Sequence, residues 1–212
     1  NIKRIIIEKD NIVLQQEIQF LLKERNLKFQ IEKTSKKYFE NKLGKEVKHQ
    51  GVAILVKKLE HLPIDKLLKN NSFTVGVLIE KITDPNNIGA IYRSAYGFNI
   101  DFIITVEDGS LIENSYLVNN ACGTFDKVNR YSTVNAVASI KKFKKNNWWV
   151  IGADSKAKSD THSFFSKYKK DDKILIVLGS EGKGLRRLTK DNCDLLLKIP
   201  IKNELDSLNV ST

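Results

Sequence analysis

The stretch VGVLIEKITDPNNIGAIYRSAYGF, residues 75–98, joins an apolar run to a polar turn and then to a helix-like segment. Its apolar run, Val75–Ile79, carries no polar side chain, which is typical of a strand buried on both faces. Asp84 and Pro85 indicate a turn, and Asn86 or Asn87 is expected to cap a helix over residues 86–97. This unit predicts an α/β fold.

The same alternation of strand and helix continues to the end of the chain. Helical patterns at 134–145 and 184–192 separate further apolar runs, which favours a parallel sheet covered on both faces. In such sheets, ligands gather at the carboxyl ends of the strands. The four further runs are Phe102–Val106, Trp148–Ala153, Ile174–Leu178 and Leu195–Ile199.

Residues 1–60 are predicted to form a separate, small α/β domain. Short strands are expected at Ile5–Ile7, Phe29–Ile31 and Val52–Val56. Ser35 is expected to open a lysine-rich helical turn, and Asp10 or Asn11 to cap a longer helix. The longer helix should bury one apolar face, formed by Leu14, Ile18, Leu21 and Leu22.

The polar stretch that follows, with Pro63 and the pair Asn70 and Asn71, predicts a linker over residues 61–72. The larger domain then occupies residues 73–212. Because the chain contains no methionine, it is interpreted as part of a longer product, and the C-terminal helix is expected to be incomplete.

The net charge of +11 suits a polyanionic partner such as RNA, although lysine-rich surfaces also serve solubility alone. Residues 1–60 carry 14 Lys and Arg against 8 Asp and Glu, so more than half of this surplus lies in the small domain. Cys122 and Cys193 are too far apart for a zinc knuckle, and the apolar runs are too short to span a bilayer. We expect a cytoplasmic protein with no metal and no membrane partner.

A second distinctive loop, LGSEGKGL, covers Leu178–Leu185 and offers three glycines between a strand and a helix. Glycines there leave backbone groups free to hold a ligand, but a flexible turn explains them equally well. The spacing is neither that of a Walker loop nor that of a dinucleotide fingerprint, and Glu181 would repel a pyrophosphate. A ligand with a cationic centre, or a hydroxyl group to be oriented, fits better.

A third segment, IPIKNELDSLNVST, covers Ile199–Thr212. Ser207 is expected to cap a helix that begins at Leu208, so that Ser207 and Asn209 lie at its positive end. Each of the three segments, taken alone, also has a simple explanation as a cap or a turn. Their joint occurrence after strands of one sheet is what favours a site.

Together the three segments resemble the signature motifs of the SpoU family of RNA ribose 2′-O-methyltransferases, also called TrmH-like, over residues 74–212. The first motif is matched by Asp84, Pro85, Asn87, Gly89, Ala90 and Arg93. The second is matched by Gly179, Glu181, Gly182 and Gly184, and the third by Ser207–Ser211. The segment GLRRLTKDNCDLLLKIP, and the HQG at His49–Gly51, are similar to the bacterial branch that methylates a guanosine of 23S rRNA.

The resemblance implies a parallel sheet with a C-terminal deep trefoil knot of the SPOUT type, preceded by a substrate-binding domain like that of ribosomal proteins. It implies a homodimer, S-adenosyl-L-methionine as cofactor and RNA as partner. The implied catalytic residues are Asn87, Arg93, Glu181, Ser207 and Asn209. The implied cofactor-binding residues are Leu178, Gly179, Gly182, Ile199, Ile201 and Leu208.

One segment departs from the family pattern. Lys202, Asn203 and Glu204 follow Ile-Pro-Ile where the family places a small residue and a glycine, and Asn203 is expected to replace that glycine because Asn tolerates left-handed geometry. A guanidinium is a poor base, so Arg93 is interpreted as a clamp for phosphate and oxyanion, with the base left open. The alternatives are a tRNA 2′-O-methyltransferase and an idle RNA-binding assembly factor. A dehydrogenase is disfavoured because the chain lacks its glycine fingerprint.

Overall fold

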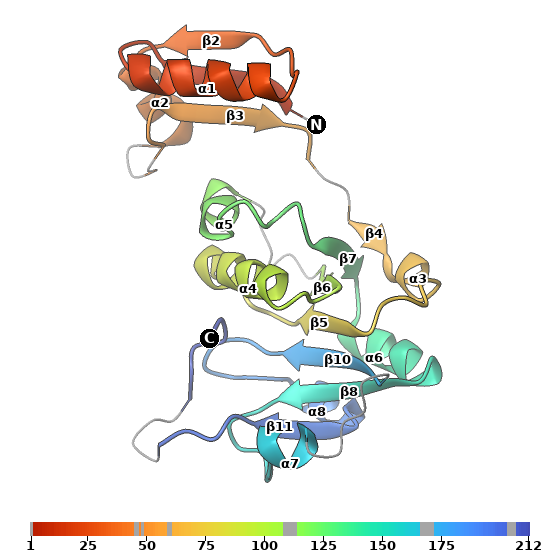
Figure 1. Ribbon diagram of the computed structural model, residues 1–212. Helices are drawn as coiled ribbons and strands as arrows, with labels where there is room; N and C mark the ends of the chain where they lie inside the picture. Colours follow the sequence, from red (N-terminus) through yellow and green to blue (C-terminus); the bar gives the residue numbers. More distant parts are fainter. Residues whose placement is uncertain are drawn as a thin grey trace. The chain divides into compact units, whose positions relative to one another are not determined.

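The computed structural model describes residues 2–44, 47, 49–58, 61–107, 114–165, 172–202 and 207–212, which divide into two compact units at residues 60 and 61. Figure 1 labels the elements of both units. Within the described residues, no helix is long and apolar enough to cross a membrane.

The first unit is a three-stranded sheet with two helices. Its strands run in the order β2-β1-β3, with β2 parallel and β3 antiparallel to the central strand. The small α/β unit expected from the sequence is therefore present, although β2 begins two residues later than predicted. Its elements are β1 (Ile2–Glu8), α1 (Ile12–Glu24), β2 (Ile31–Thr34), α2 (Lys36–Leu43) and β3 (Val52–Val56).

Helix α1 buries less of its apolar stripe than predicted. Asn11 caps it by accepting a hydrogen bond from the backbone of Leu14. The buried residue of the helix is Gln15, whose amide donates to the carbonyls of Glu8 and Lys9. Leu21 remains 47% exposed, although seven residues bring it back to within about 20° of Leu14 around the helix. The core of this unit is formed by Ile5, Ile7, Phe39 and Val47.

The second unit contains an eight-stranded, all-parallel sheet in the order β4-β7-β6-β5-β10-β8-β11-β9. The five strands predicted for it are all present, within one residue of their expected bounds. The strands are β4 (Leu62–Pro63), β5 (Val75–Ile79), β6 (Phe102–Val106), β7 (Asn129–Thr133), β8 (Trp148–Ala153), β9 (Ser159–Asp160), β10 (Lys173–Leu178) and β11 (Leu195–Lys198).

Helices cover both faces of this sheet (Figure 1). The face that carries Val77 and Ile79 packs against α4 and α5, whereas the face that carries Leu78 and Leu175 packs against α3 and α6. The predicted two-sided parallel sheet is thus confirmed. The helices are α3 (Ile64–Leu67), α4 (Pro85–Gly97), α5 (Ser115–Asn120), α6 (Ala136–Lys145), α7 (Thr161–Phe165) and α8 (Arg187–Asn192).

The predicted linker at residues 61–72 is wrong. It contains β4 and α3 and belongs to the second unit, where Leu67 is fully buried and Ile64 is 6% exposed. The polar composition misled the prediction, because the segment covers one sheet edge with only a few apolar side chains. Helix α8 likewise starts at Arg187 and not at residue 184, since residues 180–184 close a turn of their own.

Candidate active site

The candidate site lies between two neighbouring strands that are followed by helices on opposite faces of the sheet. Strands β5 and β10 pair side by side, but β5 is followed by α4 on one face and β10 leads to α8 on the other. In open parallel sheets, such a switch point opens a crevice at the carboxyl ends of the strands. The first and second motif loops, which follow β5 and β10, border this crevice.

The first motif presents Asn87 on the first turn of α4. The expected cap by Asn86 or Asn87 is wrong, because the Asp84 carboxylate accepts from the backbone N–H of Asn86 at 2.9 Å and Pro85 occupies the first helical position. Asn87 is thereby left free for a tertiary contact. Its Nδ2 donates to Oε1 of Glu181, 94 residues further along the chain, at 2.5 Å.

The second motif loop folds back on itself and holds Glu181 at its outer tip. Ser180 and Gly184 form an isolated antiparallel bridge, in which the N–H of Gly184 donates to the carbonyl of Ser180 at 2.8 Å. A Cβ on Gly179 would lie 2.3 Å from the backbone of Gly184 and Leu185, so only glycine fits there. The loop geometry therefore depends on Gly179, which the family resemblance had assigned to cofactor binding.

The third segment returns to the first motif. The predicted cap by Ser207 is wrong: the described residues 207–212 form a turn, in which the Oδ1 of Asn209 accepts from the N–H and the Oγ of Ser211 at 2.9 and 2.8 Å. Ser211 also lies with its Oγ 3.4 Å from Oδ1 of Asn87. Sequence reasoning had included Ser211 in the motif but had given it no role.

These contacts join all three motifs in one network. Glu181 contacts Asn87, Asn87 contacts Ser211, and Ser211 contacts Asn209. Val210 anchors this end of the chain by packing against the apolar cluster that includes Val77 and Ile88. Side chains from three distant segments thus meet at one sheet edge, as their positions after the strands had indicated.

Arg93 is not brought into this network within the described part of the chain. Helix α4 is continuous from Asn87 to Arg93, so the two side chains point about 120° apart. Arg93 is exposed, and its Nη1 lies 4.0 Å from Sγ of Cys122. Helix α5 can approach closely because Gly89 has no side chain: a Cβ there would lie 2.7 Å from the carbonyl oxygen of Leu117.

The expected cofactor-binding residues occupy three segments beyond the ends of β10 and β11. The carbonyl of Leu178 accepts from the backbone of Glu80 at 2.9 Å. Among the described residues, no backbone hydrogen bond of a turn or loop engages the other five positions. These five are Gly179, Gly182, Ile199, Ile201 and Leu208, while Asn203 lies outside the described residues.

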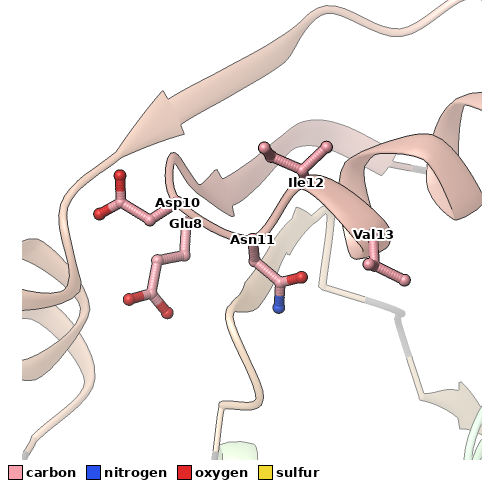
Figure 2. A pocket seen from close by; sticks show the side chains of 5 residues that line it. All are labelled: Glu8, Asp10, Asn11, Ile12 and Val13. Atoms are coloured by element: carbon pink, nitrogen blue, oxygen red, sulfur yellow. The ribbon is translucent and has the colours of Figure 1, made fainter.

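A separate hollow of about 450 Å³ lies in the first unit, where β1 meets α1. Figure 2 shows the carboxylates of Glu8 and Asp10 on its wall, beside Asn11 and the apolar side chains Ile12 and Val13. Two carboxylates on its wall repel phosphate, and none of its lining residues carries a positive charge. This hollow is therefore a poor candidate for an RNA backbone.

Comparison with known proteins agrees with the arrangement of motifs. Residues 74–212 match the model of the SpoU rRNA Methylase family. The chain belongs to this family. It is 33% identical over 208 residues to an uncharacterized tRNA/rRNA methyltransferase of Borreliella burgdorferi, covering 92% of this chain and 87% of that protein.

A second relative of this SpoU family chain is the 23S rRNA (guanosine-2′-O-)-methyltransferase RlmB of Neisseria meningitidis. The two are 32% identical over 173 residues, which cover 81% of this chain and 68% of that protein. The crystal structure of the SpoU methyltransferase AviRb from Streptomyces viridochromogenes superimposes with a TM-score of 0.76 at 16% identity, covering 100% of this chain and 77% of that one. This structural likeness confirms the fold.

Proposed function

We propose that this chain transfers a methyl group from S-adenosyl-L-methionine to a ribose 2′-hydroxyl of RNA, and that the target is a guanosine of 23S rRNA. The observation that carries the proposal is the network of Asn87, Glu181, Ser211 and Asn209, which joins the three family motifs at the switch point of the sheet. The guanosine target is supported by the similarity to the relative named RlmB and by the basic first unit.

The residues present fit the cofactor. No turn or loop backbone hydrogen bond engages Gly179, Gly182 or Ile201 among the described residues, and their N–H and C=O groups suit the polar edge of an adenine and a carboxylate. Ile199 and Leu208 expose 56% and 38% of their surface and offer apolar contact to a flat ring. When bound, S-adenosyl-L-methionine supplies an electrophilic methyl group.

The side chains of the network have separate roles in this proposal. Glu181 holds the Asn87 amide through their hydrogen bond, so that Asn87 presents a fixed orientation to the ribose. Ser207 and Asn209 orient the attacking hydroxyl group, which must lose its proton as it forms the new bond. Arg93 clamps the adjacent phosphate and stabilises the developing oxyanion, since a guanidinium stays protonated.

We also propose that the chain forms a homodimer through helix α4. Arg93 projects outward from α4, away from the network, and the same helix exposes 46% of Tyr96, while Phe98 at its end is 80% exposed. Aromatic side chains beside a functional arginine suit an interface with a second copy of the chain. A homodimer would therefore bury them next to Arg93.

The knot is proposed from the path of the chain. Strand β11 is separated from β5 by β8 and β10, yet Ser211, shortly after β11, reaches Asn87 on the helix that follows β5. This return of the chain from the β11 side of the sheet to the β5 side supports the knot that the family resemblance implies. Residues 1–60, with most of the positive surplus, are the proposed RNA-binding domain.

The test is methyl transfer from labelled S-adenosyl-L-methionine to unmodified transcripts of 23S rRNA and of tRNA. We expect transfer to 23S rRNA, and an about 10²–10³-fold lower rate for Arg93→Ala with cofactor binding retained. Arg93→Lys keeps the charge but lacks the planar fork, and should recover only part of the loss. Undiminished activity of Arg93→Ala would exclude the clamp.

The same assay separates the alternatives. Transfer to tRNA alone would favour a tRNA methyltransferase, which shares the motifs. An absence of S-adenosyl-L-methionine binding in calorimetry would favour an idle assembly factor. Mapping 2′-O-methylation in total RNA from cells with and without the protein would then identify the nucleotide.

A further inference from the structure

A hollow of about 300 Å³ lies at the second motif loop, where its lining includes Ser180 and Lys183 but not Glu181. The volume is at the lower end of the range of ligand sites. The full lining is Glu80, Lys81, Ser180, Lys183, Gly184, Leu185, Arg186 and Arg187. One short loop therefore contributes both to the catalytic network and to this hollow.

Four of the eight lining residues are cationic and one is acidic. The acidic residue, Glu80, is 3% exposed, and its Oε1 accepts from Oγ1 of Thr189 at 3.0 Å and lies 3.7 Å from Nε of Arg186. The buried carboxylate thus tethers Arg186 and the start of α8 beneath the hollow. Its other oxygen, Oε2, has no hydrogen-bond partner among the described residues, and the four cations of the lining outnumber this one carboxylate, so the lining carries a net positive charge.

The rim cations are Lys81 and Lys183, one from each side of the crevice, together with the exposed Arg187. Within residues 61–107, 114–165, 172–202 and 207–212, neither lysine lies within ion-pair distance of a carboxylate. Arg187 has a partner, Asp191, at 3.7 Å on its own helix. Two exposed ammonium groups that line one hollow, with no acidic partner among the described residues, are suited to an anion.

The backbone at Lys81 adds a constraint. Its φ is +56°, a left-handed conformation that is uncommon for a residue with a side chain. Directly before it, the N–H of Glu80 donates to the carbonyl of Leu178 and so extends the pairing of β5 with β10. The position of Lys81 at the mouth of the crevice is therefore fixed by the sheet.

We infer that this hollow is a subsite for a backbone phosphate of the RNA substrate, held by Lys81 and Lys183 beside the catalytic network. The inference rests on the proposed function and adds a place where the RNA strand is bound by residues other than those that match the three motifs. It assigns a binding role to two lysines that the catalytic proposal does not use.

The test compares Lys81→Ala, Lys183→Ala and the double variant with wild type and with Lys141→Ala. Lys141 is an exposed lysine of α6, outside the hollow, so this control removes the same charge elsewhere. The measurements are kcat and KM for methyl transfer to an unmodified 23S rRNA transcript, the salt dependence of binding to that transcript, and S-adenosyl-L-methionine affinity by calorimetry.

We expect each hollow variant to raise KM for RNA about three- to tenfold with kcat and cofactor affinity retained. The slope of log K against log salt should fall by about one for each lysine and by about two for the double variant, with Lys141→Ala near wild type. Equal effects of Lys141→Ala and the hollow variants would overturn the subsite, as would a loss confined to cofactor affinity. If wild type itself transfers no methyl group to any RNA, the proposed function fails instead.

Discussion

Replacing Gly179 by alanine should disrupt the second motif loop more than alanine at any other glycine of that loop. The new Cβ would lie 2.3 Å from the carbonyl carbon of Gly184 and from the N of Leu185, more than an ångström inside the 3.4 Å of ordinary contact. Both are backbone atoms, so no side chain can rotate away. The loop must instead separate from the strand end, which breaks the bridge between Ser180 and Gly184.

The expected magnitude follows from this geometry. Overpacking of a tight site costs about 1–3 kcal/mol, which lowers the melting temperature of a unit of this size by about 3–10 °C. Because Glu181 sits on the displaced loop, its 2.5 Å contact with Asn87 is lost as well. A displacement of about 1 Å at a catalytic group lowers rates about 10²-fold, so methyl transfer should fall at least that far.

Tryptophan fluorescence is the suitable unfolding signal, because both tryptophans of the chain, Trp148 and Trp149, lie in the second unit. Gly97→Ala is the matched control: a Cβ there meets nothing within 4 Å, and alanine in a helix should stabilise by about 0.5–1 kcal/mol. A Gly179→Ala protein with the melting temperature and activity of wild type would refute the steric argument.

Two further predictions test the network and the partly buried thiol of Cys193. Asn87→Ala and Glu181→Ala should each reduce methyl transfer, and the double variant should be no worse than the more damaged single variant, because both remove the same 2.5 Å hydrogen bond; multiplicative losses in a double-mutant cycle would contradict this. Burial raises the pKa of Cys193 to about 11 from 9.0, so the unfolded chain loses this proton first as the pH rises. The unfolding free energy should therefore fall between about pH 9 and pH 11, and Cys193→Ala should flatten that decline in pH-dependent fluorescence unfolding; an unchanged decline would exclude the thiol as its source.

The elements of the larger unit were predictable because their signals are local. Strands such as Val75–Ile79 and Trp148–Ala153 are short apolar runs between turns, and their observed bounds coincide with the predicted ones. Strand β7 was missed since Asn129–Thr133 is polar or aromatic at each position, and its pairing with β6 creates the strand. The linker prediction failed for the same reason, because α3 is recognisable only from the core that buries Leu67.

The candidate site, like the fold, was predictable from the sequence only in part. The sequence by itself determined which residues carry the motifs, that the fold alternates strands and helices, and that the motif segments follow strand ends. It placed the helix cap wrongly at Asn86 or Asn87, because Asp84 and both asparagines are cap-forming residue types and only the local backbone geometry selects Asp84. It also could not reveal that Ser211 links two motifs, because hydrogen bonds between segments depend on strand order.

Only the tertiary structure decided that β5 and β10 are neighbours, which brings Asn87 to Glu181 across 94 residues and gathers Lys81 and Lys183 at one hollow. The physical reason is that periodicity and capping act over a few residues, whereas the order of strands in a parallel sheet is set by how the buried faces pack against their helices.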